Sequence, residues 1–121
     1  MVVTLCTEDQ AKFHAGTNVD STISTAEWTD LINEAEGVIC TETKVNWIDI
    51  YGSLNSDCKK ILQVATACYS ANGAIKHNPN GYLDNAEFST LLNVNTYNFE
   101  RAMSRLKERP FSDFVRNQTT L

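Results

Sequence analysis

Residues of mostly apolar character recur at helical spacing over two long stretches of the chain. The first stretch carries Trp28, Leu31, Ile32, Ala35, Val38 and Ile39. The second carries Phe88, Leu91, Leu92, Asn95, Phe99, Ala102, Met103 and Leu106. Residues at this spacing line one face of an α-helix, which can then be buried against a neighbour. The pattern predicts one long helix that ends near residues 40–41 and another that continues until Pro110 stops it.

Capping residues precede these two stretches and a short helix before them. Ser24 and Glu27 form a capping box, in which each side chain accepts a hydrogen bond from the backbone of the other. Segment 84–87 repeats the signature with aspartate in the first position. Thr7 can cap a short helix over residues 7–14. The solvent-facing side of the first long helix is expected to consist of Asp30, Asn33, Glu34 and Glu36.

A third long helix is predicted to begin near Ser53 or Asn55. Its apolar stripe consists of Ile61, Leu62, Ala65, Cys68, Tyr69 and Ile75. Small residues in its middle allow neighbouring helices to approach closely, so we expect this helix at the centre of the fold. Before it, Asn46 can cap a single turn that runs to Tyr51 and ends at Gly52. A short strand over the same residues is the alternative.

The predicted fold class is all-α: a small helical bundle of three long helices and a short N-terminal helix, with an extended C-terminal tail. Only 2 prolines and 5 glycines interrupt the chain, and residues 78–81 have the composition of a turn. A length of 121 residues fits one domain. We expect a single helical domain over residues 1–110, followed by a tail, 111–121, that is too short to fold alone.

Charge and hydropathy exclude several classes of protein. The chain has 15 acidic and 10 basic residues, a formal net charge of −5, whereas nucleic-acid-binding proteins carry a basic face. A hydrophobic fraction of 42% is enough to form a folded core. No apolar run approaches the ~20 residues of a membrane span, and the first residues lack the basic flank of a secretory signal. Since no catalytic motif is present, we expect neither an enzyme nor a membrane protein.

The cysteines and histidines form no metal-binding pattern. The chain contains Cys6, Cys40, Cys58 and Cys68 without a C-x-x-C pair, and its histidines are His14 and His77. Zinc sites need closely paired ligands, so we expect no metal and no cofactor. An even number of cysteines leaves two disulfides possible in an oxidising compartment. The helical positions of Cys40 and Cys68 favour buried thiols instead.

One segment resembles the calcium-binding loop of an EF-hand. With Gly81 at loop position 6, residues 76–87 place oxygen-bearing side chains at positions 3, 5, 9 and 12. A fainter copy covers residues 16–27. Position 1 should be aspartate but is Lys76 in one loop and Gly16 in the other. A polar turn before a capped helix explains both patterns more simply. A degenerate EF-hand-like module for calcium or protein binding stays the alternative function.

Aromatic residues outside the helical stripes are candidates for contacts with partners. Phe111, Phe114 and Val115 follow Pro110 in an otherwise polar tail. These side chains either fold back onto the bundle or dock on another chain. Trp28 lies in a stripe and is expected in the core, whereas Trp47 is either a second core anchor or a contact residue.

Several features follow one another along the chain. They are a short N-terminal segment, a helix with an Ala-Glu pair followed by a threonine, a central helix and a long last helix. In this sequence they correspond to Val2–Leu5, Trp28–Glu36 with Thr43, Leu54–Ala67 and Phe88–Leu106. This order resembles the small head–tail connector (adaptor) proteins of tailed viruses.

The resemblance implies a virion structural protein, assembled in the host cytoplasm. Such proteins form a homo-oligomeric ring, commonly a dodecamer, below the portal protein and join the head to tail or neck proteins. DNA passes through the ring without specific contacts, and an acidic lumen lets it slide. Ring contacts join different faces of neighbouring subunits. We expect the contact residues to be Trp47, Tyr51, Phe111, Phe114 and Val115.

Overall fold

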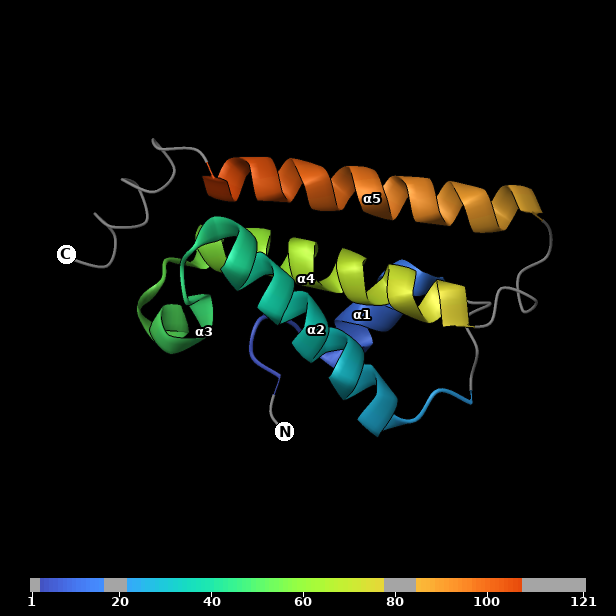
Figure 1. Cartoon of the computed structure of the whole chain (residues 1–121), viewed down its shortest axis with the longest axis horizontal. Coiled ribbons are helices and arrows are strands. Elements are labelled where there is room, and N and C mark those ends of the chain that lie inside the picture. Colours follow the sequence, from blue (N-terminus) through green and yellow to red (C-terminus); the bar gives the residue numbers. More distant parts are fainter. Residues whose placement is uncertain (1–2, 17–21, 78–84, 108–121) are drawn as a thin grey trace.

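The computed structural model describes residues 3–16, 22–77 and 85–107, and every regular element among them is helical (Figure 1). The elements are α1 (Glu8–Ala15), α2 (Thr25–Thr43), α3 (Trp47–Ile50), a 3₁₀ turn η1 (Tyr51–Ser53), α4 (Ser56–His77) and α5 (Asn85–Lys107). The predicted all-α class is thereby confirmed for these residues. The number of helices differs, because the segment after Asn46 forms α3 and η1. The alternative of a strand there is wrong.

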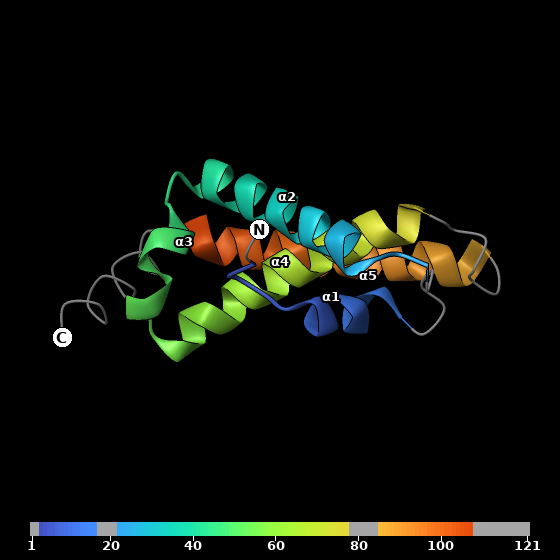
Figure 2. The same cartoon turned by 90° about the horizontal axis from the view of Figure 1, so that it is seen from below.

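The central position predicted for α4 is confirmed (Figures 1 and 2). The helices α2 and α5 each pack along α4 but make few contacts with each other, and α1 packs against α4 as well. Small side chains in α4 permit this close packing. Its fully buried small residues are Ala65, Ala67, Cys68, Ala71 and Ala74.

The capping residues predicted for α1, α2 and α3 begin those helices, whereas the cap predicted at Asp84 lies outside the described residues. Thr7 caps α1 in a capping box with Gln10, and Ser24 caps α2 in the expected box with Glu27. In α3, Oδ1 of Asn46 accepts the backbone N–H of Asp49. Each of these side chains satisfies an N–H group that the first helical turn would otherwise leave without a partner.

The end of α2 lies beyond the predicted residues 40–41. Thr43 is the last residue of α2, and Lys44 adopts a left-handed conformation with φ 59°. Its backbone N–H donates to the carbonyl oxygen of Cys40. A left-handed residue at this position is a common way to end a helix, although glycine or asparagine usually occupies it. Because lysine occupies the position, the sequence contains no glycine that would have marked the end of α2.

The loop after α2 is fixed by Trp47, which belongs to the core. The indole is 3% exposed, and its Nε1 donates to Oγ1 of Thr43 at 2.8 Å. The Thr43 hydroxyl donates in turn to the carbonyl oxygen of Ile39 at 2.7 Å. Of the two roles left open for Trp47, the structure supports the core anchor.

The polar face predicted for α2 contains one error, Glu36. This residue is 2% exposed. Its Oε2 accepts the backbone N–H groups of Thr4 at 2.7 Å and Leu5 at 2.9 Å. The N-terminal segment lies against α2 at this point and removes the carboxylate from water. Glu36 therefore anchors residues 4–5 to the bundle.

Candidate functional site

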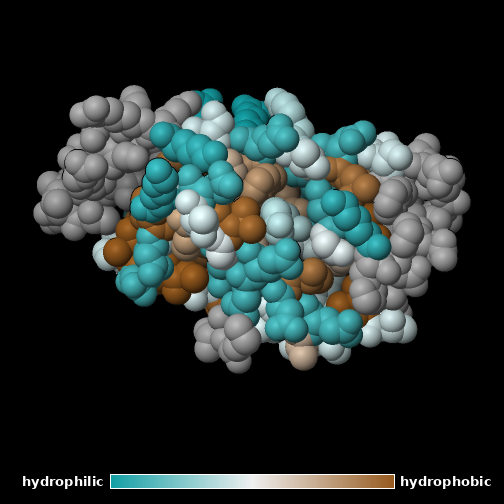
Figure 3. All heavy atoms as spheres, in the orientation of Figure 1, coloured by the Kyte–Doolittle hydropathy of each residue, from teal (hydrophilic) through white to brown (hydrophobic). Residues whose placement is uncertain are grey.

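A groove lies between α2 and α5, and this face of the molecule shows hydrophobic residues among hydrophilic ones (Figure 3). The groove consists of two adjoining hollows of about 550 and about 440 Å³, which share Phe99 and Glu100 in their walls. We call it the α2/α5 groove. The first hollow is lined by Val38, Glu42, Phe99, Glu100, Met103, Ser104 and Lys107. The second is lined by Leu31, Glu34, Tyr69, Asn72, Gly73, Lys76, Thr96, Phe99 and Glu100.

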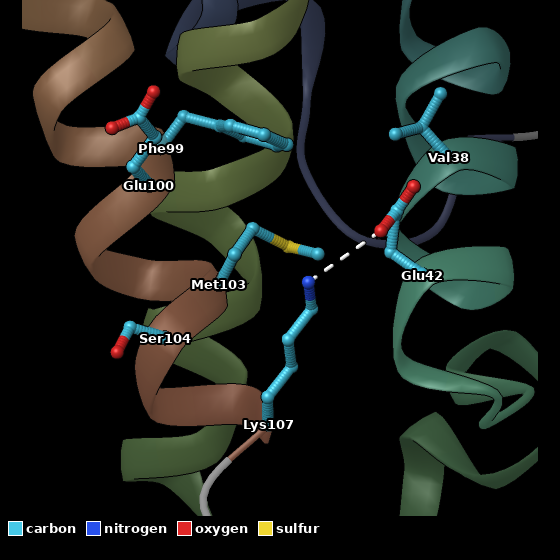
Figure 4. A pocket seen from close by; sticks show the side chains of 7 residues that line it. All are labelled: Val38, Glu42, Phe99, Glu100, Met103, Ser104 and Lys107. Atoms are coloured by element: carbon cyan, nitrogen blue, oxygen red, sulfur yellow. Dashed lines mark hydrogen bonds and ion pairs between the residues drawn. The ribbon is translucent and has the colours of Figure 1, made fainter.

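The first hollow is apolar inside and is crossed by an ion pair (Figure 4). Phe99 and Met103 extend from α5 toward α2, where Val38 faces them. At the end of the hollow, Nζ of Lys107 lies 3.5 Å from Oε2 of Glu42. Both side chains are about half exposed, so solvent screens the pair and it holds the helices together only weakly.

The second hollow is shaped by Gly73 and Asn72 of α4. A Cβ atom at Gly73 would lie 2.7 Å from Cδ2 of Leu31, so glycine lets α2 lie close to α4 here. Asn72 donates from Nδ2 to Oγ1 of Thr96 at 3.2 Å. Its Oδ1 is buried and has no hydrogen-bond partner among the described residues. A buried acceptor without a partner is costly, so this amide is a locally destabilising feature of the hollow.

Carboxylates outnumber amines along the groove. The charged residues in its lining are Glu34, Glu42, Glu100, Lys76 and Lys107. Burial raises the pKa of the Tyr69 phenol, and the charge of Glu34 raises it further. Apolar surface with a charged rim is typical of protein interfaces. The groove therefore suits a segment of protein that combines apolar side chains with a basic one.

The predicted contact residues lie apart from this groove or outside the described residues. Trp47 is buried, so its ring does not offer a surface to a partner in this conformation. Tyr51 is half-buried, and Nζ of Lys59 lies 5.0 Å from the centre of its ring. The apolar side chains that α3 exposes are Ile48 and Ile50, 39% and 38% exposed. Phe111, Phe114 and Val115 lie outside the described residues, and the interface role of all these positions stays a prediction.

The fold brings together His14 and Cys68, which lie far apart in the sequence. Nδ1 of His14 lies 3.8 Å from Sγ of Cys68, and Asn95 donates from Nδ2 to the carbonyl oxygen of His14 at 3.0 Å. Burial raises the pKa of Cys68 to about 11 and lowers the pKa of His14. The pair is a neutral thiol beside a neutral imidazole, whereas nucleophilic cysteines act as thiolates. Its contribution here is packing between α1, α4 and α5.

All four cysteines are free thiols. Cys6, Cys58 and Cys68 are buried, which confirms the prediction of buried thiols for these three. Cys40 is only half-buried and packs against the edge of the core. The possibility of two disulfides is not realised in the structure.

The EF-hand-like loops fall largely outside the described residues, so the calcium prediction is not tested. Glu27 of the first loop is the third helical residue of α2 and the partner of Ser24 in its capping box. Within residues 3–16, 22–77 and 85–107, no group of three or more His, Cys, Asp and Glu side chains is placed to hold a metal ion.

Sequence reasoning found the helices but not the groove between two of them. Val38 and Phe99 were assigned to apolar stripes and expected in the core, yet both are only half-buried. The stripes were identified from the sequence, but neither stripe indicated which of its residues would stay uncovered. Which edge of a stripe stays open depends on how the helices pack, and the spacing of residues does not contain that information.

Among the residues that the structure describes, no helix has the length and apolar character needed to cross a membrane. Comparison of the chain with family models, with curated proteins and with solved structures finds no match.

Proposed function

We propose that this chain is a virion structural protein, a head–tail connector that forms a ring below the portal protein and joins the head to tail or neck proteins. The proposal starts from the resemblance in the order of sequence features. The long helices α2 and α5 contain two of the segments on which that resemblance rests, and α4 contains most of a third. In this role the protein assembles with copies of itself and with other virion proteins, and its place is in the particle.

The observation that carries the proposal is the α2/α5 groove. Its apolar interior, formed by side chains such as Val38 and Phe99, is left open by the bundle. Surface of this kind is stabilised when another chain covers it. A ring subunit needs an acceptor surface that differs from the surface it presents to the next subunit. The groove supplies such an acceptor on one face of the molecule.

The charge of the chain supports a position around passing DNA. A formal net charge of −5 repels the phosphate backbone, so DNA moves through an acidic channel without adhering. The basic residues near the end of α5 are already counted in this net negative charge and do not reverse it. Arg105 and Lys107 are exposed in the last turn of α5, at the negative end of the helix dipole.

The groove also supports a second candidate, a protein-interaction module that works outside a virion. The chemistry of the acceptor surface is the same in both cases, so the groove alone does not separate them. Incorporation into particles does separate them, because a module of the second kind has no reason to enter a virion.

Removal of the tail tests the connector proposal. A chain that ends at Pro110 should keep its helical content by circular dichroism but fail to enter particles, because Phe111, Phe114 and Val115 are the proposed contacts. The matched control ends at Arg116 and keeps these three residues, so it should be incorporated normally. Normal incorporation of the shorter chain would contradict the assignment of the tail as a contact region.

A further inference from the structure

We propose that the C-terminal segment of one copy, residues 108–121, docks in the α2/α5 groove of a second copy. Phe111, Phe114 and Val115 cover the apolar interior of the groove, and Arg116 pairs with the carboxylates on its rim. The inference rests on the proposed function in one respect, that repetition of this contact from copy to copy builds the ring. The contact itself is a property of the purified chain and is tested without particles.

The apolar part of the groove matches the apolar part of the segment. Phe99, Met103 and Val38 line the first hollow, and its volume of about 550 Å³ is large enough to admit aromatic side chains. Phe111, Phe114 and Val115 are spaced i, i+3 and i+4. This spacing puts three side chains on one face when a segment binds as a helix, as amphipathic helices do in grooves.

One charged residue of the segment has a partner of opposite charge in the groove. Arg116 directly follows the three apolar residues, while Glu100 lies on the wall that both hollows share. Glu100 forms no ion pair or hydrogen bond with another described residue. Its carboxylate is therefore open to a guanidinium, which can bind a carboxylate with two parallel hydrogen bonds.

The ion pair between Lys107 and Glu42 favours a second copy over the same chain. Lys107 directly precedes the C-terminal segment, and its side chain crosses the groove to α2 (Figure 4). The segment of the same chain would have to reverse within residues 108–110 and re-enter past this pair. A segment from another copy reaches the groove from the solvent side. Because the groove and the segment are different surfaces, the contact is head-to-tail and can close into a ring.

Two variants, each with one of the two contact surfaces disrupted, test the contact. Val38→Glu places a charge in the groove but keeps the C-terminal segment, and Phe114→Ser weakens the segment but keeps the groove. By sedimentation velocity we expect the unmodified chain to form oligomers and each variant alone to be a monomer. An equimolar mixture should form dimers, since one intact groove meets one intact segment. Val94→Glu is the matched control, because Val94 is an exposed residue of α5 outside the groove lining, and it should assemble like the unmodified chain.

A charge exchange tests the same contact without burying a charge. Glu100→Arg and Arg116→Glu should each weaken association, and a chain that carries both substitutions should recover it. Circular dichroism verifies that each variant is folded. The proposal is overturned when the unmodified chain is monomeric at all concentrations. This is the result expected if the segment docks in the groove of its own chain. It is also overturned when the equimolar mixture of Val38→Glu and Phe114→Ser stays monomeric. The same holds when the chain with both Glu100→Arg and Arg116→Glu does not recover association. Presence of the chain in particles together with such a failure would leave the connector proposal standing and remove only this contact.

Discussion

Replacement of Glu36 by leucine is expected to lower the free energy of unfolding by about 2–5 kcal/mol, because one buried and one partly buried N–H group lose their acceptor at once. Oε2 of Glu36 accepts from the backbone of Thr4 and Leu5, and the carboxylate is almost completely buried. Each buried donor that is left without a partner costs about 1–3 kcal/mol. The N-terminal segment would separate from α2, so the loss is expected to come with exposure of Leu5.

The matched control is Glu36→Gln, which keeps an oxygen in the place of the acceptor. It loses the negative charge but not the geometry, so its loss of stability should be well below that of the leucine variant. Equilibrium unfolding in urea measures the free energy of unfolding of both variants. Equal stability of the leucine variant and the unmodified chain would show that residues 4–5 do not depend on this carboxylate.

The second large effect concerns the reactivity of the thiols. Burial raises the pKa of Cys58 and Cys68 from 9.0 to about 11. Burial also raises the pKa of Cys6 to about 12, and the charge of Glu36 adds to this shift. A rise from 9.0 to about 11 lowers the thiolate fraction at neutral pH about 100-fold, and the thiolate is the reactive form. We therefore expect the three buried thiols to react with a thiol reagent at least about 100-fold more slowly in the folded chain than in urea. Cys40 is only half-buried and should react first.

Kinetics with a chromogenic disulfide reagent measures this difference. One thiol should react quickly in the folded chain and four in urea, and Cys40→Ser should abolish the fast phase. A fast phase that survives this substitution would place another thiol at the surface. The same shifts make stability depend on alkaline pH. The pKa values are raised in the folded state, so their contribution is present below about pH 9 and is lost as the pH rises toward 11.

Local signals in the sequence predicted the helices because each signal is contained within a few residues. The capping box of Ser24 and Glu27 and the cap of Asn46 are formed as expected. The end of α2 was missed because Lys44 takes a left-handed conformation that its residue type rarely signals. Prediction therefore failed where the backbone adopts a conformation that is unusual for the side chain.

The position of Glu36 and the existence of the groove depend on tertiary packing. Glu36 lies on what the helical pattern identifies as a solvent face, and only the return of the N-terminal segment buries it. Likewise, the stripe of α5 is continuous in sequence, but α2 and α5 pack on α4 without closing over it. Such features arise from contacts between residues that are distant in the chain. Trp47, one of the expected contact residues, is likewise buried by tertiary packing.

The number of copies of this chain in purified particles tests the connector proposal most directly. Quantitative mass spectrometry of virus-sized particles from its source, relative to the major shell protein, gives this number. We expect about a dozen copies per particle, the number of subunits in one ring at the portal. Absence of the chain from particles that contain the shell protein would contradict the proposal and leave the α2/α5 groove as the acceptor surface of an interaction module.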